Sequence, residues 1–209
     1  MAECEALGVR AMGIEADLTD RAATEKAVAD IAAAMGRIDI AICNTGGGTV
    51  VFADERDLGA DPGAGANEIL DRVTTGTPAD CDQGMLTRVR AINVNTCMAV
   101  VPYMKRQGGG KIVTVSSTAG VDARGSYHPY GTAKAEIIHY TRALAQGRGP
   151  HNINVNAIAT GIIRTGRLGD RAAMAAERVP LKREGTIEDC AWSSSWSPIC
   201  RITSPAERS

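Results

Sequence analysis

Two side chains that can share a proton lie four residues apart near the middle of the chain. Tyr130 and Lys134 fall in the segment PYGTAKAEIIHYTRALAQ, whose opening proline and helically spaced apolar residues predict a helix. Residues i and i+4 of a helix share one face, with Cβ atoms about 5–6 Å apart. An ammonium at that distance stabilises the charged form of a phenol, so the pair indicates general acid–base chemistry. The alternative is an exposed pair of side chains with no chemical role.

A hydroxyl precedes this helix at the end of a predicted strand. Residues 111–115 read KIVTV after three glycines, which predicts a short buried strand, and two serines follow it. Open α/β sheets bind their ligands at the carboxyl ends of strands. Ser117 is therefore placed to hydrogen-bond the same substrate oxygen that Tyr130 would serve.

The spacing of these three residues resembles the short-chain dehydrogenase/reductase family, in which a strand-end serine is followed by tyrosine thirteen residues later and lysine four residues after that. The resemblance extends over residues 1–191. It implies that Tyr130 transfers the proton, that Ser117 holds the substrate oxygen, and that Lys134 tunes Tyr130 and holds the cofactor ribose.

Asn93 in the segment AINVN resembles the family's active-site asparagine, which holds a water molecule in the proton relay. An asparagine inside a helix is otherwise unfavourable, which also indicates a role, and Asn95 is the less suitable candidate. The resemblance implies NAD or NADP as cofactor, a small-molecule alcohol or ketone as substrate, and a homo-oligomer in the full-length form.

The resemblance also implies cofactor contacts beyond the catalytic helix, each following a predicted strand. The two residues after strand 9–16 correspond to those that line the adenine pocket in the family, although a helix cap is an alternative. The segment CNTG after strand 38–43 resembles the family's Asn-Asn-Ala-Gly, with a plain glycine turn as the alternative. A third segment, after strand 153–158, resembles the one that binds the nicotinamide amide and phosphates. The implied contacts are Asp17, Leu18, Cys43, Asn44, Thr45, Gly46, Tyr130, Lys134, Gly161, Ile163 and Thr165.

Strand patterns alternate with helix patterns along the chain, and the resemblance implies an α/β fold with a parallel sheet. The predicted helices span 21–36, 83–107 and 129–147, and residues 166–178 resemble the family's small substrate-covering helix. The family's glycine-rich turn and first two strands would precede Met1, and its last strand is missing. We therefore expect a doubly wound Rossmann-like sheet that lacks its first βαβ unit and last strand. Strand 38–43 should lie at an edge and strand 9–16 should lack a partner.

Two buried surfaces follow from the same patterns. Ala27, Val28, Ile31 and Met35 form the predicted buried stripe of helix 21–36. Strand 38–43 is apolar apart from Asp39, as expected when helices cover both faces of a sheet.

Residues 1–191 are predicted to form a single incomplete domain, with a long insertion loop over 48–82 and an irregular tail over 192–209. The loop is rich in acidic residues, so we expect it to disfavour anionic substrates at the rim of the site, unless it is only a solvated loop. The tail has neither helical nor strand periodicity. A shifted reading frame from codon 191 would explain it, and the DNA sequence would decide this.

Composition excludes several classes of protein. The 209 residues carry a formal net charge of -1, which gives no reason to expect nucleic acid or an anionic membrane as partner. No apolar run is long enough to span a membrane and no signal peptide begins the chain, so a cytoplasmic protein is expected. The six cysteines form no CxxC pair and are expected to be free thiols, and no metal site is predicted. The alternatives to an oxidoreductase are an inactive remnant, a binding or oligomerisation module, and an epimerase-like relative.

Overall fold

The computed structural model describes residues 2–45, 83–122, 129–164 and 179–194. The chain divides into two compact units, residues 1–159 and 160–209. The elements up to the unit boundary are α1 (Ala2–Ala6), α2 (Arg21–Met35), β1 (Ile40–Cys43), α5 (Gln83–Arg106), β2 (Gly110–Ser117), the 3₁₀ turn η2 (Thr118–Gly120), α6 (Pro129–Arg148), η3 (Gly149–His151) and β3 (Ile153–Thr160).

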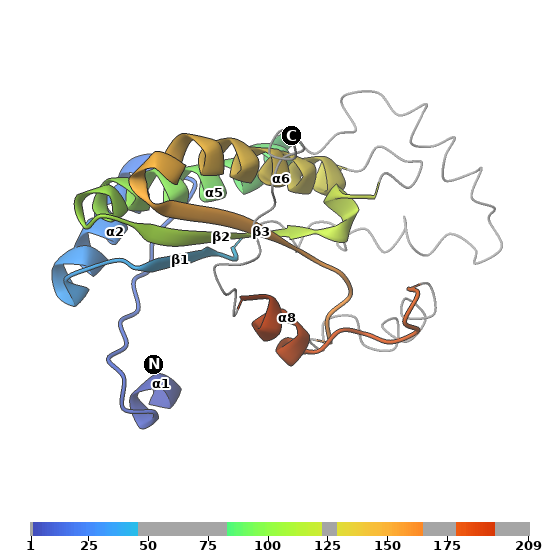
Figure 1. The fold of residues 1–209 in the computed structure, drawn as a ribbon, viewed down its shortest axis with the longest axis horizontal. Coiled ribbons are helices and arrows are strands. Elements are labelled where there is room, and N and C mark those ends of the chain that lie inside the picture. The colour runs from blue at the N-terminus through green and yellow to red at the C-terminus, as the bar shows by residue number, and fades with distance from the viewer. Residues whose placement is uncertain (1, 46–82, 123–128, 165–178, 195–209) are drawn as a thin grey trace. The chain divides into compact units, whose positions relative to one another are not determined.

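The three strands form one sheet in the order β1-β2-β3, with α2, α5 and α6 on the same face (Figure 1). β1 and β2 pair in parallel, from Ile40 opposite Lys111 to Cys43 opposite Thr114. The predicted α/β architecture with a parallel sheet is confirmed. In the described part of the chain β1 pairs only with β2, which agrees with the edge position predicted for the 38–43 strand.

Burial alternates along the strands because successive side chains point to opposite faces. Ile112, Ile153 and Val155 point into the core beneath the helices. On the other face, Ile40 and Ile42 are 58% and 59% exposed. The prediction that helices cover both faces of the 38–43 strand is therefore wrong for the part of the chain that the structure describes, where all the helices packed on this sheet lie on one side.

Capping residues lie at both ends of helix α2. The side chain of Asp20 accepts a hydrogen bond from the Ala23 amide, and Gly36 closes the helix at φ +86°. Ala27 and Val28 are buried as predicted, but Ile31 is 36% exposed and its predicted burial is wrong.

Thr24 on α2 is fully buried, unlike Ile31. Its hydroxyl donates to the carbonyl oxygens of Leu18 and Asp20 at 3.2 and 2.8 Å. These hydrogen bonds satisfy the polar group, so a threonine can occupy the interior of the packing face.

The predicted strand over residues 9–16 is wrong, since this segment has no regular secondary structure. A strand is stable only when a neighbour satisfies its backbone hydrogen-bonding groups, and no described segment pairs with it. The short helix α1 precedes this segment, and Gly8 follows it at φ +76°.

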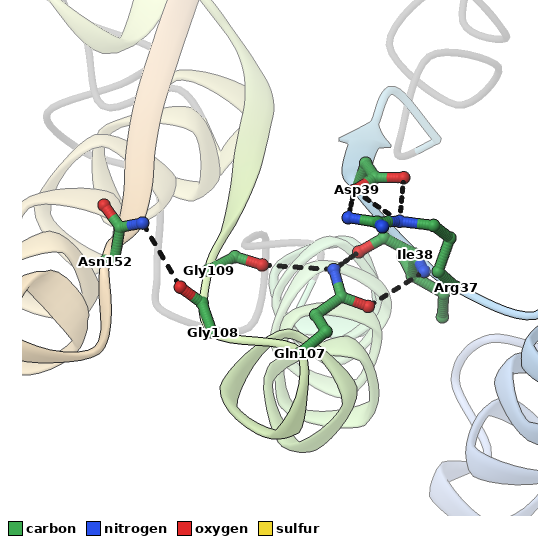
Figure 2. A network of polar contacts seen from close by, with 7 residues as sticks. All are labelled: Arg37, Ile38, Asp39, Gln107, Gly108, Gly109 and Asn152. Atoms are coloured by element: carbon green, nitrogen blue, oxygen red, sulfur yellow. Dashed lines mark hydrogen bonds and ion pairs between the residues drawn. The ribbon is translucent and has the colours of Figure 1, made fainter.

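A side-chain network at the amino-terminal end of the sheet joins three elements (Figure 2). The Gln107 side chain accepts from the Ile38 amide at 3.2 Å and donates to the carbonyl oxygens of Ile38 and Gly109 at 2.6 and 3.1 Å. The Asn152 amide donates to the Gly108 carbonyl at 3.2 Å. The network fixes the end of α5 to the starts of β1 and β2. This end of the sheet is opposite the carboxyl ends of the strands, where the predicted site lies.

The second unit contains α8 (Ile187–Ser194) and a parallel bridge between Ile163 and Gly185. Thr186 and Asp189 cap α8 reciprocally, with amide-to-side-chain distances of 2.9 and 3.2 Å. The helix extends to Ser194, so the first three residues of the segment expected to be irregular are helical. The insertion loop after Gly48, the predicted helix 166–178 and the tail from 195 lie outside the described residues.

No helix within the described ranges is both long and apolar enough to cross a membrane.

Candidate active site

The end of β2 forms hydrogen bonds with both the side chain and the backbone of Lys134. The Lys134 ammonium donates to the Val115 carbonyl at 2.9 Å, and the Ser116 hydroxyl donates to the Lys134 carbonyl at 2.7 Å. Lys134 is 3% exposed and Ser116 is 1% exposed. Two consecutive strand residues therefore fix the position of this lysine on α6.

Lys134 and Tyr130 lie on the same side of α6. The Lys134 nitrogen is 5.7 Å from the centroid of the Tyr130 ring. Tyr130 packs against a small apolar cluster that includes Val89, Ala133 and Ile137. Burial lowers the pKa of the Lys134 ammonium from its ordinary value, because desolvation disfavours the charged form.

Ser117 lies at the carboxyl end of β2, where the chain turns into η2. Its hydroxyl oxygen accepts a hydrogen bond from the Ala119 amide at 3.2 Å and caps this turn. Accepting uses a lone pair, so the hydroxyl hydrogen can be donated to a substrate oxygen. The capping bond also orients the hydroxyl.

Gly120 sets the distance between η2 and α6. A Cβ atom at this position would lie 2.6 Å from the Ala135 nitrogen, 2.6 Å from the Lys134 carbonyl carbon and 2.9 Å from the Lys134 Cβ. Only glycine allows this approach without displacement. The turn that begins at Ser117 is thus held directly against the turn of α6 that carries Lys134.

Asn93 lies fully buried on α5, which packs against α6. Its amide nitrogen donates to the Val89 carbonyl at 2.9 Å. Its Oδ1 atom is buried and has no hydrogen-bond partner within the described residues. A buried carbonyl oxygen of this kind is suited to accept a hydrogen bond from a water molecule.

The two residues assigned to the adenine pocket form the turn before α2. The Asp17 carboxylate accepts from the Thr19 hydroxyl at 2.7 Å and the Thr19 amide at 2.9 Å, and these bonds lower the pKa of Asp17. The Asn95 amide donates to the carbonyls of Leu18 and Thr19, each at 3.1 Å. The turn is therefore tied to α5. The alternative of a helix cap at Asp17 is not needed, because Asp20 caps α2.

The remaining cofactor candidates are placed less completely. Cys43 is buried at the end of β1, and Asn44 and Thr45 follow it in exposed positions. Gly161 and Ile163 belong to the second compact unit. Gly46 and Thr165 lie outside the described residues, so the structure does not bring these groups together.

Three residues with a positional role were missed by the sequence reasoning: Ser116, Gly120 and Asn95. Strand alternation could have found Ser116, because it lies on the opposite side of the strand from Ser117 and hence on the helix-covered face. Asn95 could have been found as the second asparagine of the same helix, because two positions along a helix place it on a different face from Asn93. Nothing in the sequence alone shows that Gly120 meets the α6 backbone.

Comparisons with known proteins identify the family. Residues 1–176 match the family model for short chain dehydrogenases. The chain is 40% identical over 204 residues to a cyclohexanol dehydrogenase from Rhodococcus sp. (strain TK6), over 90% of this chain and 66% of that protein. The chain therefore belongs to the short-chain dehydrogenase family. It spans just under two thirds of the length of that relative.

Solved structures show the same fold. A short-chain type dehydrogenase/reductase from Mycobacterium marinum matches with a TM-score of 0.68 at 25% identity, over 92% of this chain and 70% of that one. NAD⁺-bound xylitol dehydrogenase matches with a TM-score of 0.69 at 23% identity, over 93% of this chain and 75% of that one, which is a likeness of fold. The expected Rossmann-like α/β class is confirmed.

Proposed function

We propose that this protein is an NAD(P)-dependent oxidoreductase that interconverts a secondary alcohol and a ketone. Membership of the family supports this class of reaction and this class of cofactor. The observation that carries the proposal is the buried Lys134, one helical turn from Tyr130 and anchored to the strand that ends in Ser117. The relative's name, cyclohexanol dehydrogenase, suggests a cyclic alcohol as the first substrate to test.

In this proposal Tyr130 gives a proton to the substrate oxygen during ketone reduction and removes it during alcohol oxidation. The Ser117 hydroxyl donates a hydrogen bond to the same oxygen and orients it. The positive charge of Lys134 favours the phenolate form of Tyr130. The orphan Oδ1 of Asn93 would accept from a water molecule that links Lys134 to solvent.

The residues present fit part of a dinucleotide site. An ammonium has three donors, and Lys134 gives one of them to the Val115 carbonyl, so it also suits the hydroxyls of a ribose. The turn at Asp17 and Leu18, which Asn95 holds in place, would contact the adenine. The nicotinamide would supply the hydride-transfer chemistry.

The test compares two tyrosines of the same helix. Tyr130→Phe should lower the turnover of cyclohexanol with NAD⁺ or NADP⁺ by about 10²-fold or more, because it removes the proton-transferring group. Binding of NADH or NADPH should survive. Tyr140→Phe is the matched control, since Tyr140 has a buried hydroxyl without a partner in the described region and no role in the reaction.

Two results would refute the proposal. One is a Tyr130→Phe protein that turns over cyclohexanol as fast as the Tyr140→Phe protein. The other is a folded wild-type chain that binds neither NADH nor NADPH, which would favour an inactive remnant or a binding module.

A further inference from the structure

Two buried thiols meet between the sheet and the helix layer. Cys43 is the last residue of β1 and Cys97 lies in the middle of α5, 54 positions further along the chain, with their sulfur atoms 3.8 Å apart. Cys43 is 6% exposed and Cys97 is fully buried, and both belong to the main apolar core. The proposed reaction uses neither sulfur atom.

We infer that Cys43 and Cys97 form a reversible intramolecular disulfide when the protein meets hydrogen peroxide. The Cys43 thiolate attacks one peroxide oxygen and breaks the O–O bond, which converts Cys43 to a sulfenic acid. The hydroxide that is released takes up a proton and becomes water. Cys97 then attacks the Cys43 sulfur, so that the S–S bond forms as the S–O bond breaks and a second water departs. Two thiols lose two protons and two electrons in total, and one peroxide becomes two waters.

The geometry requires a small change. A disulfide has a sulfur–sulfur bond of about 2.05 Å, so the two sulfur atoms must approach by about 1.8 Å from their present contact. Rotation of one cysteine about its Cα–Cβ bond moves the sulfur over a distance of this order. Both side chains already point toward each other across the core, since the sulfur atoms are within hydrogen-bonding distance.

The chemistry also distinguishes the two thiols. The contact with Cys97 lowers the pKa of Cys43, whereas the contact with Cys43 and burial raise the pKa of Cys97. Cys43 also lies at the end of β1 and is 6% exposed, whereas Cys97 is fully buried, so an oxidant reaches Cys43 first; Cys43 is the nucleophile and Cys97 the resolving thiol.

Access for a small oxidant follows from the position of β1. This strand has four residues and pairs only with β2 in the part of the chain that the structure describes. Short edge strands open locally at a lower free energy than central ones, and such an opening would expose Cys43 at the strand end. Hydrogen peroxide is small enough to enter through it.

The experiment uses the full chain, first reduced, then treated with hydrogen peroxide, alkylated and digested for mass spectrometry. The expected product is a peptide pair that joins Cys43 to Cys97, with a mass about 2 Da below the sum of the reduced peptides, and dithiothreitol should reverse it. The thermal midpoint of the oxidised chain should rise, because the bond closes a long loop.

Cys97→Ser should abolish the joined peptide, and Cys4→Ser, which changes an exposed thiol, should leave it unchanged. The inference is overturned if both thiols are recovered alkylated under conditions that oxidise Cys4. It is also overturned if Cys43 reaches sulfinic acid while Cys97 stays free, or if either cysteine joins a different partner. The wild-type peptide map decides these outcomes even if a variant fails to fold.

Discussion

Replacing Gly120 with alanine would place a methyl group 2.6 Å from two backbone atoms of α6, the Lys134 carbonyl carbon and the Ala135 nitrogen. Favourable contacts between such atoms lie at about 3.5–4.0 Å, so the two segments must separate by about 1 Å. The hydrogen-bonded backbone of α6 cannot yield locally, so η2 has to move, and Ser117 caps this turn. Overpacking of this kind costs about 1–3 kcal/mol of stability. A displacement of about 1 Å near a reacting group can lower turnover by about 10²-fold.

The assay is urea-induced unfolding together with turnover of cyclohexanol, and Gly147→Ala is the matched control. Gly147 lies on α6, and a methyl group at this position would meet nothing within 4 Å in the described part of the chain apart from its chain neighbours and the adjacent backbone of its own helix. Its replacement should stabilise the protein by about 0.5–1 kcal/mol, because alanine is the better helix former. The steric reasoning is refuted if Gly120→Ala unfolds with the same free energy as wild type. The turnover arm depends on the proposed function, and the unfolding arm does not.

Two further predictions concern charge and hydrogen bonding. Since burial lowers the pKa of Lys134 below 10.5, the unfolded chain binds more protons between the folded-state pKa and that value, and stability rises with pH there. The free energy of unfolding of wild type minus that of Lys134→Met should therefore increase in urea titrations from about pH 7 to about pH 10, and a flat difference would contradict this. Gln107→Leu should destabilise the protein by about 1–3 kcal/mol, because Ile38 loses both backbone hydrogen bonds to this side chain. In the same urea assay the exposed control Gln146→Leu should change stability by about 0.5 kcal/mol or less, and equal effects would refute this role.

Local signals in the sequence predicted most of the fold correctly. Pro129 opens α6, because proline suits the first turn of a helix. The edge position of β1 followed from the strand order implied by the resemblance. The errors arose where a neighbour decides the outcome. A strand at residues 9–16 needs a partner that apolar alternation cannot provide.

The candidate site could be predicted only as far as spacing reaches. The separation of four positions between Tyr130 and Lys134 predicts a shared helix face, and the structure places the two side chains on the same side of α6. The spacing could not reveal that Ser116 and Gly120 hold Lys134 in position, because those contacts join segments through tertiary packing. It also could not show that Asn95 secures the turn at Leu18, which comes from a distant part of the chain.

The position of β1 has a consequence for solution behaviour. Among the residues that the structure describes, β1 pairs only with β2. Alternate amides of such a strand point away from its neighbour, so deuterium should enter β1 in an alternating pattern, fast at one residue and slow at the next. Ile40 and Ile42 of this strand are exposed, and exposed apolar residues on an edge strand favour pairing with another chain. Light-scattering measurements over a dilution series would therefore show how strongly self-association of this protein depends on its concentration.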